Sequence, residues 1–535
     1  MTDMDGTLTG LLAAQRGKGR ALVYRGRTWS YDEIDGLSRQ AAAGLQALGI
    51  GPGDRVALWL PNCPAYLVLW FACARLGAVA VAVNTRYRSV EVGDLLRRTG
   101  STALACWPGF RGIDFAGILA AVDPAALSAL RNVIVYEEED ARAAVAPSLP
   151  GAAIVPYGSL LDRPAMDADF ATPDSPCNMF TTSGTTKAPK LVLHRQSVIV
   201  RHGRDVAAAF GYDRPEACLL QAVPLCGVFG MSQYAATLAA GAPSVMMSAF
   251  DATEAAGLIN THRVTDSVGA DDMMDRLLAA GEGDRPFPSL RRFGFASFNA
   301  GLADIVERAA ARGILLFGLY GSSEVQALFS LQQVDAPPER RRLGGGFPVA
   351  PEAQVRARDR ESGEILPHGE AGELEIRAPS LMVGYDGDPE ASAAAFTPDG
   401  FFRTGDLGYS LADGSFVYLA RAGDALRLGG FLVNPAEIEA HLLAHATVAD
   451  CQVVGVETGR GSAAAAFVIP KDGAEADETV LRAHCQGALA GFKVPVRIFP
   501  VAAFPTTQSA NGTKIQRTKL REMAQAAIDA GKPGG

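Results

Sequence analysis

Residues 181–190 read TTSGTTKAPK, and the rest of the chain is best interpreted outward from them. From Thr182 onward, four of these residues carry hydroxyl groups, one is glycine and two are lysines. Hydroxyls, exposed backbone N–H groups and ammonium groups together suit a polyphosphate, whose negative charge is spread over many oxygens. The stretch is not a Walker A loop, because G-x-x-x-x-G-K occurs nowhere in the chain. Taken alone, a stretch of this composition is more often a solvated turn.

Composition places the chain among large, acidic, globular proteins. Of its 535 residues, 48% are hydrophobic and 20% are charged, and the formal net charge is -9. Such apolar content excludes a largely disordered chain, and the length supports several domains. Because the charge balance is negative, a wide contact with a nucleic-acid backbone is disfavoured, and we expect no nucleic-acid partner.

Cysteine spacing and the apolar runs bear on the compartment. The eight cysteines lie far apart without a C-x-x-C pair, which favours a reducing cytosol over a disulfide or zinc framework. The acidic N-terminus is unlike a signal peptide. Arg75 and Gly77 interrupt the apolar run 65–83, which favours a buried helix followed by a buried strand over a membrane span. We therefore expect a cytoplasmic protein without a membrane span.

The hydrophobic patterns predict an α/β fold. Apolar residues recur at helical spacing over residues 28–48, and buried strands are predicted at 56–60 and 79–83. Continued alternation of strands and helices predicts parallel α/β subdomains. From about residue 350 the pattern alternates between apolar and polar residues, which predicts a β-barrel-like subdomain.

A small α+β unit is predicted after the β-rich region. Asn434-Pro435-Ala436-Glu437 is a favourable helix start, with Asn as the N-cap and Pro at the first helical position. Ala422-Gly423 lowers the barrier to backbone rotation and is a suitable hinge. We expect a large N-terminal domain over residues 1–422 and a small, mobile C-terminal domain over residues 423–535.

The stretch 182–190 resembles the phosphate-binding signature T-S-G-T-T-G-x-P-K-G of the adenylate-forming (ANL) superfamily, which includes AMP-dependent acyl-CoA synthetases, adenylation domains and luciferases. This chain departs from it at Lys187 and Leu191, which replace glycines. Further signatures follow in the family's order, so that the resemblance covers residues 20 to 525. It implies that ATP phosphates are bound by Thr182, Ser183, Gly184, Thr185, Thr186 and Lys190, with Thr186 also catalytic.

The second signature, YGSSE at 320–324, resembles the family's Y-G-x-T-E. The resemblance implies that Tyr320 stacks on adenine, that Ser323 contacts phosphate and that Glu324 is a catalytic residue holding Mg²⁺. These roles suit an aromatic face and a hard oxygen ligand. Alone, the motif would read as a loop aromatic with a surface acid. The nucleotide site implied by resemblance also includes Gly321, Ser322 and the altered adenine-lining stretch Asn299, Ala300 and Gly301.

The third signature, FFRTGDLG at 401–408, resembles W-x-x-T-G-D-L-G. It implies that Asp406 binds the ribose hydroxyls, for which a bidentate carboxylate is suited. Arg421 matches the family arginine before the hinge, a contact to ribose or phosphate. Gly423 stands where relatives carry a hinge Asp or Lys, and Gly429 and Gly430 match the loop that admits the thiol.

The last signature lies near the C-terminus. Residues 505–517 resemble P-x-T-x-x-G-K-I-x-R, with Thr513 added between glycine and lysine. The resemblance implies that Lys514 is the catalytic lysine of adenylation, whereas a lone lysine in such a loop is normally only solvated. The added Thr513 shifts the register of the match and leaves Lys519 as a remote alternative.

Together the motifs imply an ATP-dependent carboxylic acid–CoA ligase. Glu324 with Mg²⁺, and Lys514, would offset the repulsion between the carboxylate and the α-phosphate. Acyl-adenylate would form with release of pyrophosphate, and the thiol of CoA would then displace AMP. The implied cofactors and substrates are ATP, Mg²⁺, CoA and a fatty or aromatic acid, and no cysteine needs a covalent role.

The size of the acid substrate is inferred from PLCGVFG at 224–230, where relatives usually carry P-x-F-H-x-x-G. Cys226 and Gly227 replace the aromatic residue and the histidine, and the small Gly227 predicts room for a bulkier or cyclic acid. Apolar residues of this kind are more often simply part of the core. The candidate acyl pocket comprises Cys226, Gly227, Phe229, Phe298 and Leu319.

Two alternatives stay open. The chain could load the phosphopantetheine of a carrier protein instead of CoA. It could also be a catalytically weakened acyl-adenylate-binding protein, which the departures at Lys187, Gly227, Gly423 and Thr513 would explain. The sequence leaves the identity of the acid and the oligomeric state open, a homodimer included.

Overall fold

An eight-stranded sheet lies in the N-terminal part of the chain. Its strand order is β19-β9-β8-β4-β3-β5-β6-β7, parallel from β8 to β7, with β9 and β19 antiparallel. The run 65–83 forms α3 (Pro64–Leu76) followed by β4 (Val79–Ala82), which confirms the predicted helix and strand. The other strands are β3 (Arg55–Trp59), β5 (Ala103–Cys106), β6 (Asn132–Val135), β7 (Ala153–Pro156), β8 (Pro176–Thr181), β9 (Leu191–Arg195) and β19 (Gly384–Tyr385).

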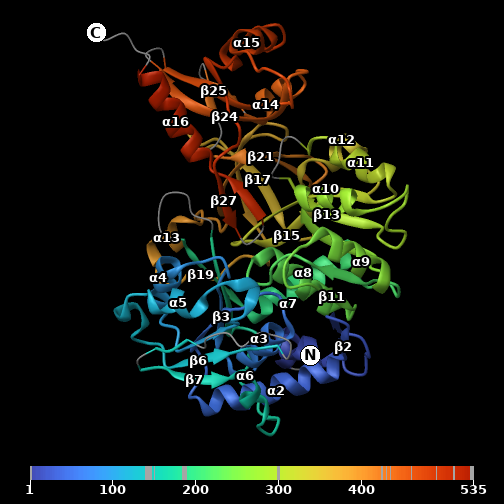
Figure 1. Ribbon diagram of the computed structural model, residues 1–535, viewed down its shortest axis with the longest axis vertical. Helices are drawn as coiled ribbons and strands as arrows, with labels where there is room; N and C mark the ends of the chain where they lie inside the picture. The colour runs from blue at the N-terminus through green and yellow to red at the C-terminus, as the bar shows by residue number, and fades with distance from the viewer. Residues whose placement is uncertain are drawn as a thin grey trace.

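These elements come from a computed structural model, shown in Figure 1. The structure describes residues 3–138, 147–149, 151–182, 189–297, 302–422, 426–428, 431–433, 435–458, 461–489, 491–509 and 512–530.

A thirteen-stranded sheet packs beside the first and changes character along its length. Its order is β17-β18-β20-β21-β16-β15-β14-β13-β12-β10-β11-β1-β2. The strands from β14 to β1 are parallel, whereas those from β14 to β17 are antiparallel.

The strands of this sheet are β1 (Leu22–Tyr24), β2 (Arg27–Trp29), β10 (Leu219–Gln221), β11 (Ser244–Met246), β12 (Asp266–Ala270), β13 (Arg292–Ala296), β14 (Leu315–Ser322), β15 (Gln326–Leu331), β16 (Gly344–Pro348), β17 (Gln354–Arg358), β18 (Gly372–Arg377), β20 (Phe402–Ser410) and β21 (Phe416–Arg421). The α/β fold with parallel subdomains is confirmed. The β-rich region after residue 350 is the antiparallel end of this sheet, with β17 at its edge, so among the described strands it forms an open sheet rather than a closed barrel.

The central helices pack against one another as well as on the sheets. α2 (Tyr31–Ala47) begins with a capping box between Ser30 and Glu33 and packs on α3. α7 (Gln196–Phe210) packs on α8 (Val228–Ala240). The remaining N-terminal helices are α1 (Leu8–Ala13), α4 (Ser89–Thr99), α5 (Phe115–Ala120), α6 (Tyr157–Leu161), α9 (Ala252–His262), α10 (Asp271–Ala280), α11 (Ile305–Ala311), α12 (Pro338–Arg341) and α13 (Pro389–Ala394).

The C-terminal lobe lies at one end of the molecule (Figure 1). A three-stranded sheet of β24 (Val448–Thr458), β25 (Gly461–Pro470) and β26 (Arg497–Pro500) carries α14 (Pro435–Leu443), α15 (Glu478–Gln486) and α16 (Arg517–Ala530). Two ribbons complete it: β22 (Leu426–Leu428) with β23 (Phe431–Val433), and β27 (Thr506–Ser509) with β28 (Gly512–Ile515). The lobe has its own apolar clusters.

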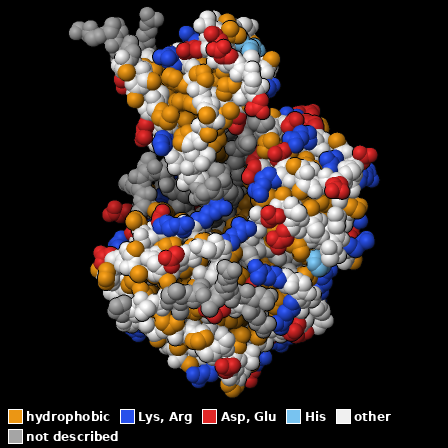
Figure 2. All heavy atoms as spheres, viewed as in Figure 1, with side chains coloured by type: hydrophobic (Ala, Val, Ile, Leu, Met, Phe, Trp, Pro, Cys, Tyr) orange, Lys and Arg blue, Asp and Glu red, His pale blue; other side chains and the backbone are white. Residues whose placement is uncertain are grey.

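Figure 2 shows a row of Lys and Arg side chains on the larger part of the molecule, along the side that faces the C-terminal lobe. The domain boundary between residues 422 and 423 stays a prediction. Within the described residues, no helix combines the length and apolar character needed to cross a membrane.

Candidate active site

Backbone and side-chain hydrogen bonds close the base of the signature loop. Thr182 follows β8, and its N–H donates to the carbonyl oxygen of Lys190 over 3.0 Å. The N–H of Lys190 donates in return to Thr182 Oγ1 over 3.1 Å. This reciprocal pair brings the two ends of the signature together. The predicted phosphate ligands Ser183, Gly184, Thr185 and Thr186, with Lys187, lie outside the described residues.

Tyr385 connects the signature lysine to Glu324. The Nζ atom of Lys190 lies 4.1 Å from the centroid of the Tyr385 ring. The Tyr385 hydroxyl donates to Glu324 Oε1 over 3.1 Å. Burial, reinforced by the Glu324 charge, holds the pKa of Tyr385 above its usual value, so the hydroxyl stays a donor. Sequence analysis missed Tyr385, since no motif contains it.

Tyr320, Asp406 and Arg421 form a second, adjoining group. The Tyr320 hydroxyl donates to Asp406 Oδ2 over 2.6 Å, and Arg421 forms an ion pair with Asp406 Oδ1 at 3.1 Å. Asp406 and Arg421 are cross-strand partners in β20 and β21. Burial raises the pKa of Asp406, an effect that the positive charge of Arg421 opposes and that the negative charge of Glu324 reinforces. The two groups are therefore close enough to act electrostatically as one site.

Two buried histidines fasten the segment that carries Glu324. His194 Nε2 donates to the carbonyl oxygen of Ser323, and His202 Nε2 donates to that of Ala327, each over 2.7 Å. A carbonyl can only accept, so both rings carry their proton on Nε2. Burial lowers the pKa of each histidine to about 4, which keeps both neutral at neutral pH. Neither histidine belongs to a signature, and a lone histidine in a sequence favours a core residue.

Three of the five predicted acyl residues lie at the start of α8. Cys226 and Gly227 precede the helix and Phe229 lies in its first turn, whereas Leu319 comes from β14. Burial raises the pKa of Cys226 to about 12, so it remains a thiol. All eight cysteines are free, as the spacing predicted. Phe298, Asn299, Ala300 and Gly301 lie outside the described residues.

The C-terminal signature forms a ribbon. Lys514 lies in β28 opposite Thr507, and the added Thr513 lies opposite Gln508 in regular register. The insertion therefore fits the ribbon without a bulge. The Lys514 side chain and the whole of Gly423, Gly429 and Gly430 lie outside the described residues, so their roles stay predictions.

Arg517 closes the C-terminal signature as a structural residue. It forms an ion pair with Glu439 at 2.8 Å and donates to Gln452 Oε1 over 3.1 Å. Glu439 is 1% exposed and also accepts the N–H of Val453. The arginine thus fixes the start of α16 to α14 and β24.

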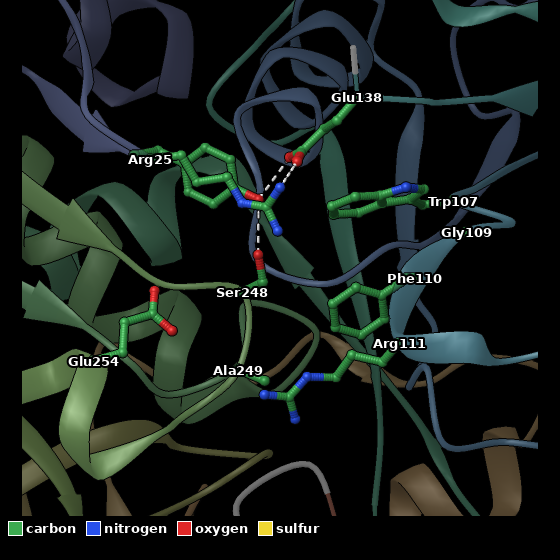
Figure 3. A pocket seen from close by; sticks show the side chains of 10 residues that line it. Arg25, Trp107, Gly109, Phe110, Arg111, Glu138, Ser248, Ala249 and Glu254 are labelled. Atoms are coloured by element: carbon green, nitrogen blue, oxygen red, sulfur yellow. Dashed lines mark hydrogen bonds and ion pairs between the residues drawn. The ribbon is translucent and has the colours of Figure 1, made fainter. Parts of the chain in front are cut away.

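A cavity of about 280 Å³ lies elsewhere, between the two large sheets (Figure 3). Tyr24 donates to Glu138 and hydrogen-bonds Ser248, each at 2.7 Å, while Arg25 forms an ion pair with Glu138. None of the predicted site residues lines this cavity.

Comparisons with known proteins identify the family of the chain. The model of the AMP-binding enzyme family matches residues 12–386, and that of its C-terminal domain matches residues 437–511. A 3-[(3aS,4S,7aS)-7a-methyl-1,5-dioxo-octahydro-1H-inden-4-yl]propanoyl:CoA ligase of Mycobacterium tuberculosis is 33% identical, over 94% of this chain and 95% of the relative. Triostin synthetase I of Streptomyces triostinicus is 32% identical, over 94% of this chain and 91% of the relative.

Among solved structures, ATP-bound MatB from Rhodopseudomonas palustris superposes with a TM-score of 0.84 at 25% identity, over 97% of this chain and 99% of MatB. The AMP-binding model alone matches well over half of the chain, and the relatives cover nearly all of it. The chain therefore belongs to the AMP-binding enzymes, the adenylate-forming superfamily that includes the AMP-forming acid–thiol ligases.

Proposed function

We propose that the chain is an ATP-dependent acid–CoA ligase that activates a bulky or cyclic carboxylic acid. One observation carries the proposal: Lys190, Tyr385, Glu324, Asp406 and Arg421 converge from β19, β20, β21 and the ends of β9 and β14. A cation, a carboxylate with a free oxygen and a ribose-binding carboxylate in one place suit ATP. Residues 423–535 would act as the mobile C-terminal domain.

The site fits a magnesium ion held mainly by nucleotide phosphates. Glu324 Oε1 accepts the Tyr385 hydroxyl, whereas Oε2 accepts no hydrogen bond from a described residue and is available as a hard oxygen ligand. Within the described residues, no cluster of His, Cys, Asp and Glu could hold a metal alone. When bound, Mg²⁺ supplies charge neutralisation at the phosphates.

The residues then have distinct tasks in adenylation. Lys190 and the signature loop bind the phosphates, Asp406 accepts hydrogen bonds from ribose hydroxyls, and Lys514 stabilises charge on the α-phosphate. A substrate carboxylate oxygen attacks the α-phosphorus, the bond to the β-phosphate oxygen breaks, and pyrophosphate leaves. The CoA thiolate then attacks the acyl carbon, the bond to AMP oxygen breaks, and AMP leaves. No protein nucleophile is required.

The substrate class rests on Gly227 and on the relatives. Gly227 leaves room where the family usually has histidine, and the Mycobacterium tuberculosis relative is named for a bicyclic acid. Gly227→His should lower kcat/KM for ring-containing acids about tenfold and leave short acids unaffected. Steady-state kinetics on matched acids measure this, and unchanged selectivity would refute the assignment.

The acyl acceptor, CoA or the phosphopantetheine of a carrier protein, has to be tested, because one relative is named a triostin synthetase rather than a CoA ligase. Pyrophosphate release should be measured with ATP, Mg²⁺ and a panel of acids, with CoA, with hydroxylamine or with neither. Turnover that needs CoA supports the ligase. Turnover with hydroxylamine but not with CoA would point to a carrier protein, and ATP binding without any release would point to a weakened binding protein.

A lysine pair tests the assignment of the catalytic residue. Lys514→Ala should reduce acid-dependent pyrophosphate release at least a hundredfold, because the charge opposite the α-phosphate is lost. Lys519→Ala, an exposed lysine on α16, is the matched control and should retain activity. Loss of activity in Lys519→Ala but not in Lys514→Ala would identify Lys519 as the catalytic lysine.

A further inference from the structure

The segment that follows Glu324 carries backbone strain at two buried residues. Gln326 and Leu328 in β15 have φ angles of 66° and 62°, and both are 1% exposed. Positive φ is unfavourable for residues with a Cβ and persists where the surrounding structure imposes it, most often at functional sites. Glycine, which adopts positive φ without strain, occupies neither position. Each residue therefore retains its side chain although its backbone conformation is unfavourable.

The Gln326 side chain holds a buried amide that is only half satisfied. Ser232 Oγ on α8 donates to Gln326 Oε1 over 3.2 Å. Gln326 Nε2 has no acceptor within the described parts of the chain. Exchanging the amide oxygen and nitrogen leaves the deficit in place, because Oε1 would then lose its partner. A buried amide with an unpaired end is unfavourable unless a water molecule or a ligand completes it.

This amide lies beside the segments assigned to the acyl site. Ser232 is one helical turn beyond Val228, and Gly227 immediately precedes that helix. α8 packs directly on β15, and Val228, Met231 and Leu328 belong to one apolar cluster. The Gln326 amide is therefore held against α8, the helix that begins directly after Gly227 in the segment assigned to the acyl site.

We propose that Gln326 is a specificity-determining residue that donates a hydrogen bond from Nε2 to an oxygen on the acyl part of the acid. The inference rests on the proposed ligase function and narrows its substrates to ring-containing acids that carry a keto or hydroxyl group. Ser232 is a positioning residue, because its bond to Oε1 orients Nε2. An acid of equal shape without the oxygen leaves the donor unpaired and reacts more slowly.

A matched pair of acids tests the role of Gln326: 3-(4-oxocyclohexyl)propanoic acid and 3-cyclohexylpropanoic acid. We expect wild-type kcat/KM, from pyrophosphate release, to favour the oxo acid about tenfold, as one neutral hydrogen bond allows. Gln326→Met should bring the ratio to about one by slowing the oxo acid alone. Gln233→Met is the control, because Gln233 is buried on α8 next to Ser232 and its Nε2 already donates to the Leu220 carbonyl oxygen.

A wild-type ratio near one, or an unchanged ratio in Gln326→Met, overturns the role of Gln326 and leaves the ligase intact. Absence of pyrophosphate release with every acid contradicts the ligase and this role together.

A stability measurement gives a readout that is independent of turnover. The double variant Ser232→Ala/Gln326→Met removes both polar groups, so the Tm of the free protein should be unchanged or higher. A clear fall in Tm would show that the amide is satisfied without substrate and would overturn the proposal.

Discussion

At the scale of single residues, Tyr385 contacts Lys190 through its ring face and donates a hydrogen bond to Glu324 through its hydroxyl. Tyr385→Phe keeps the ring face under Lys190 and removes only the bond to Glu324. Because hydrogen bonds to charged groups are worth about 1.5–3 kcal/mol, kcat/KM for ATP should fall at least about tenfold. ATP-dependent pyrophosphate release measures this, with Tyr409→Phe in β20 as the control. Equal losses in both variants would contradict the assignment.

His194 and His202 give a second prediction at this scale. Their pKa values of about 4 lie below the usual 6.5, so between these values the folded state binds fewer protons than the unfolded state. The free energy of unfolding should therefore fall as pH falls from 6.5 to 4, by about 1.4 kcal/mol per pH unit for each histidine. Urea unfolding at several pH values measures the slope. His202→Gln, which cannot titrate, should lower the slope by the share of one histidine, and an unchanged slope would refute this origin.

At the scale of elements, the α7–α8 pair depends on close backbone approach. A Cβ on Gly203 would lie 2.8 Å from the carbonyl oxygen of Ala235, so Gly203→Ala should separate the helices and cost about 1–3 kcal/mol. Gly257→Ala in α9 meets nothing within 4 Å and should be neutral or stabilising, as expected for a helix interior. Denaturant unfolding of both variants checks this, and equal behaviour would argue against close packing.

At the scale of the whole molecule, the C-terminal lobe is held by a buried ion pair. Arg517→Ala leaves Glu439, 1% exposed, without its cation and should destabilise the lobe by about 3 kcal/mol. Hydrogen exchange should rise over residues 435–530 and stay unchanged over the N-terminal sheets. Lys519→Ala on the same helix is the control. Uniform loss of protection in both parts would mean that the lobe does not unfold separately.

Local motifs made part of the site predictable. Successive backbone and hydroxyl groups suit phosphate, so a phosphate-binding stretch of the kind proposed from Thr182 to Lys190 leaves a local pattern in the sequence. Tyr385 left none, because it meets Glu324 across 61 residues. His194 likewise reaches Ser323 across 129 residues. Such partners depend on how β19, β9 and β14 are placed, which hydrophobic periodicity does not specify.

The amino-acid sequence alone determined the α/β class, the order of the signatures and the buried character of α3 and β4. These properties follow from side-chain polarity and local backbone preference, which act over a few residues. Only the tertiary structure decided that the β-rich region is an open end of the thirteen-stranded sheet. It alone decided that Asp406 is shared by Tyr320 and Arg421, and that Gln326 Nε2 has no acceptor among the residues that the structure describes. Those outcomes depend on which distant groups burial brings together, and burial acts on the whole molecule.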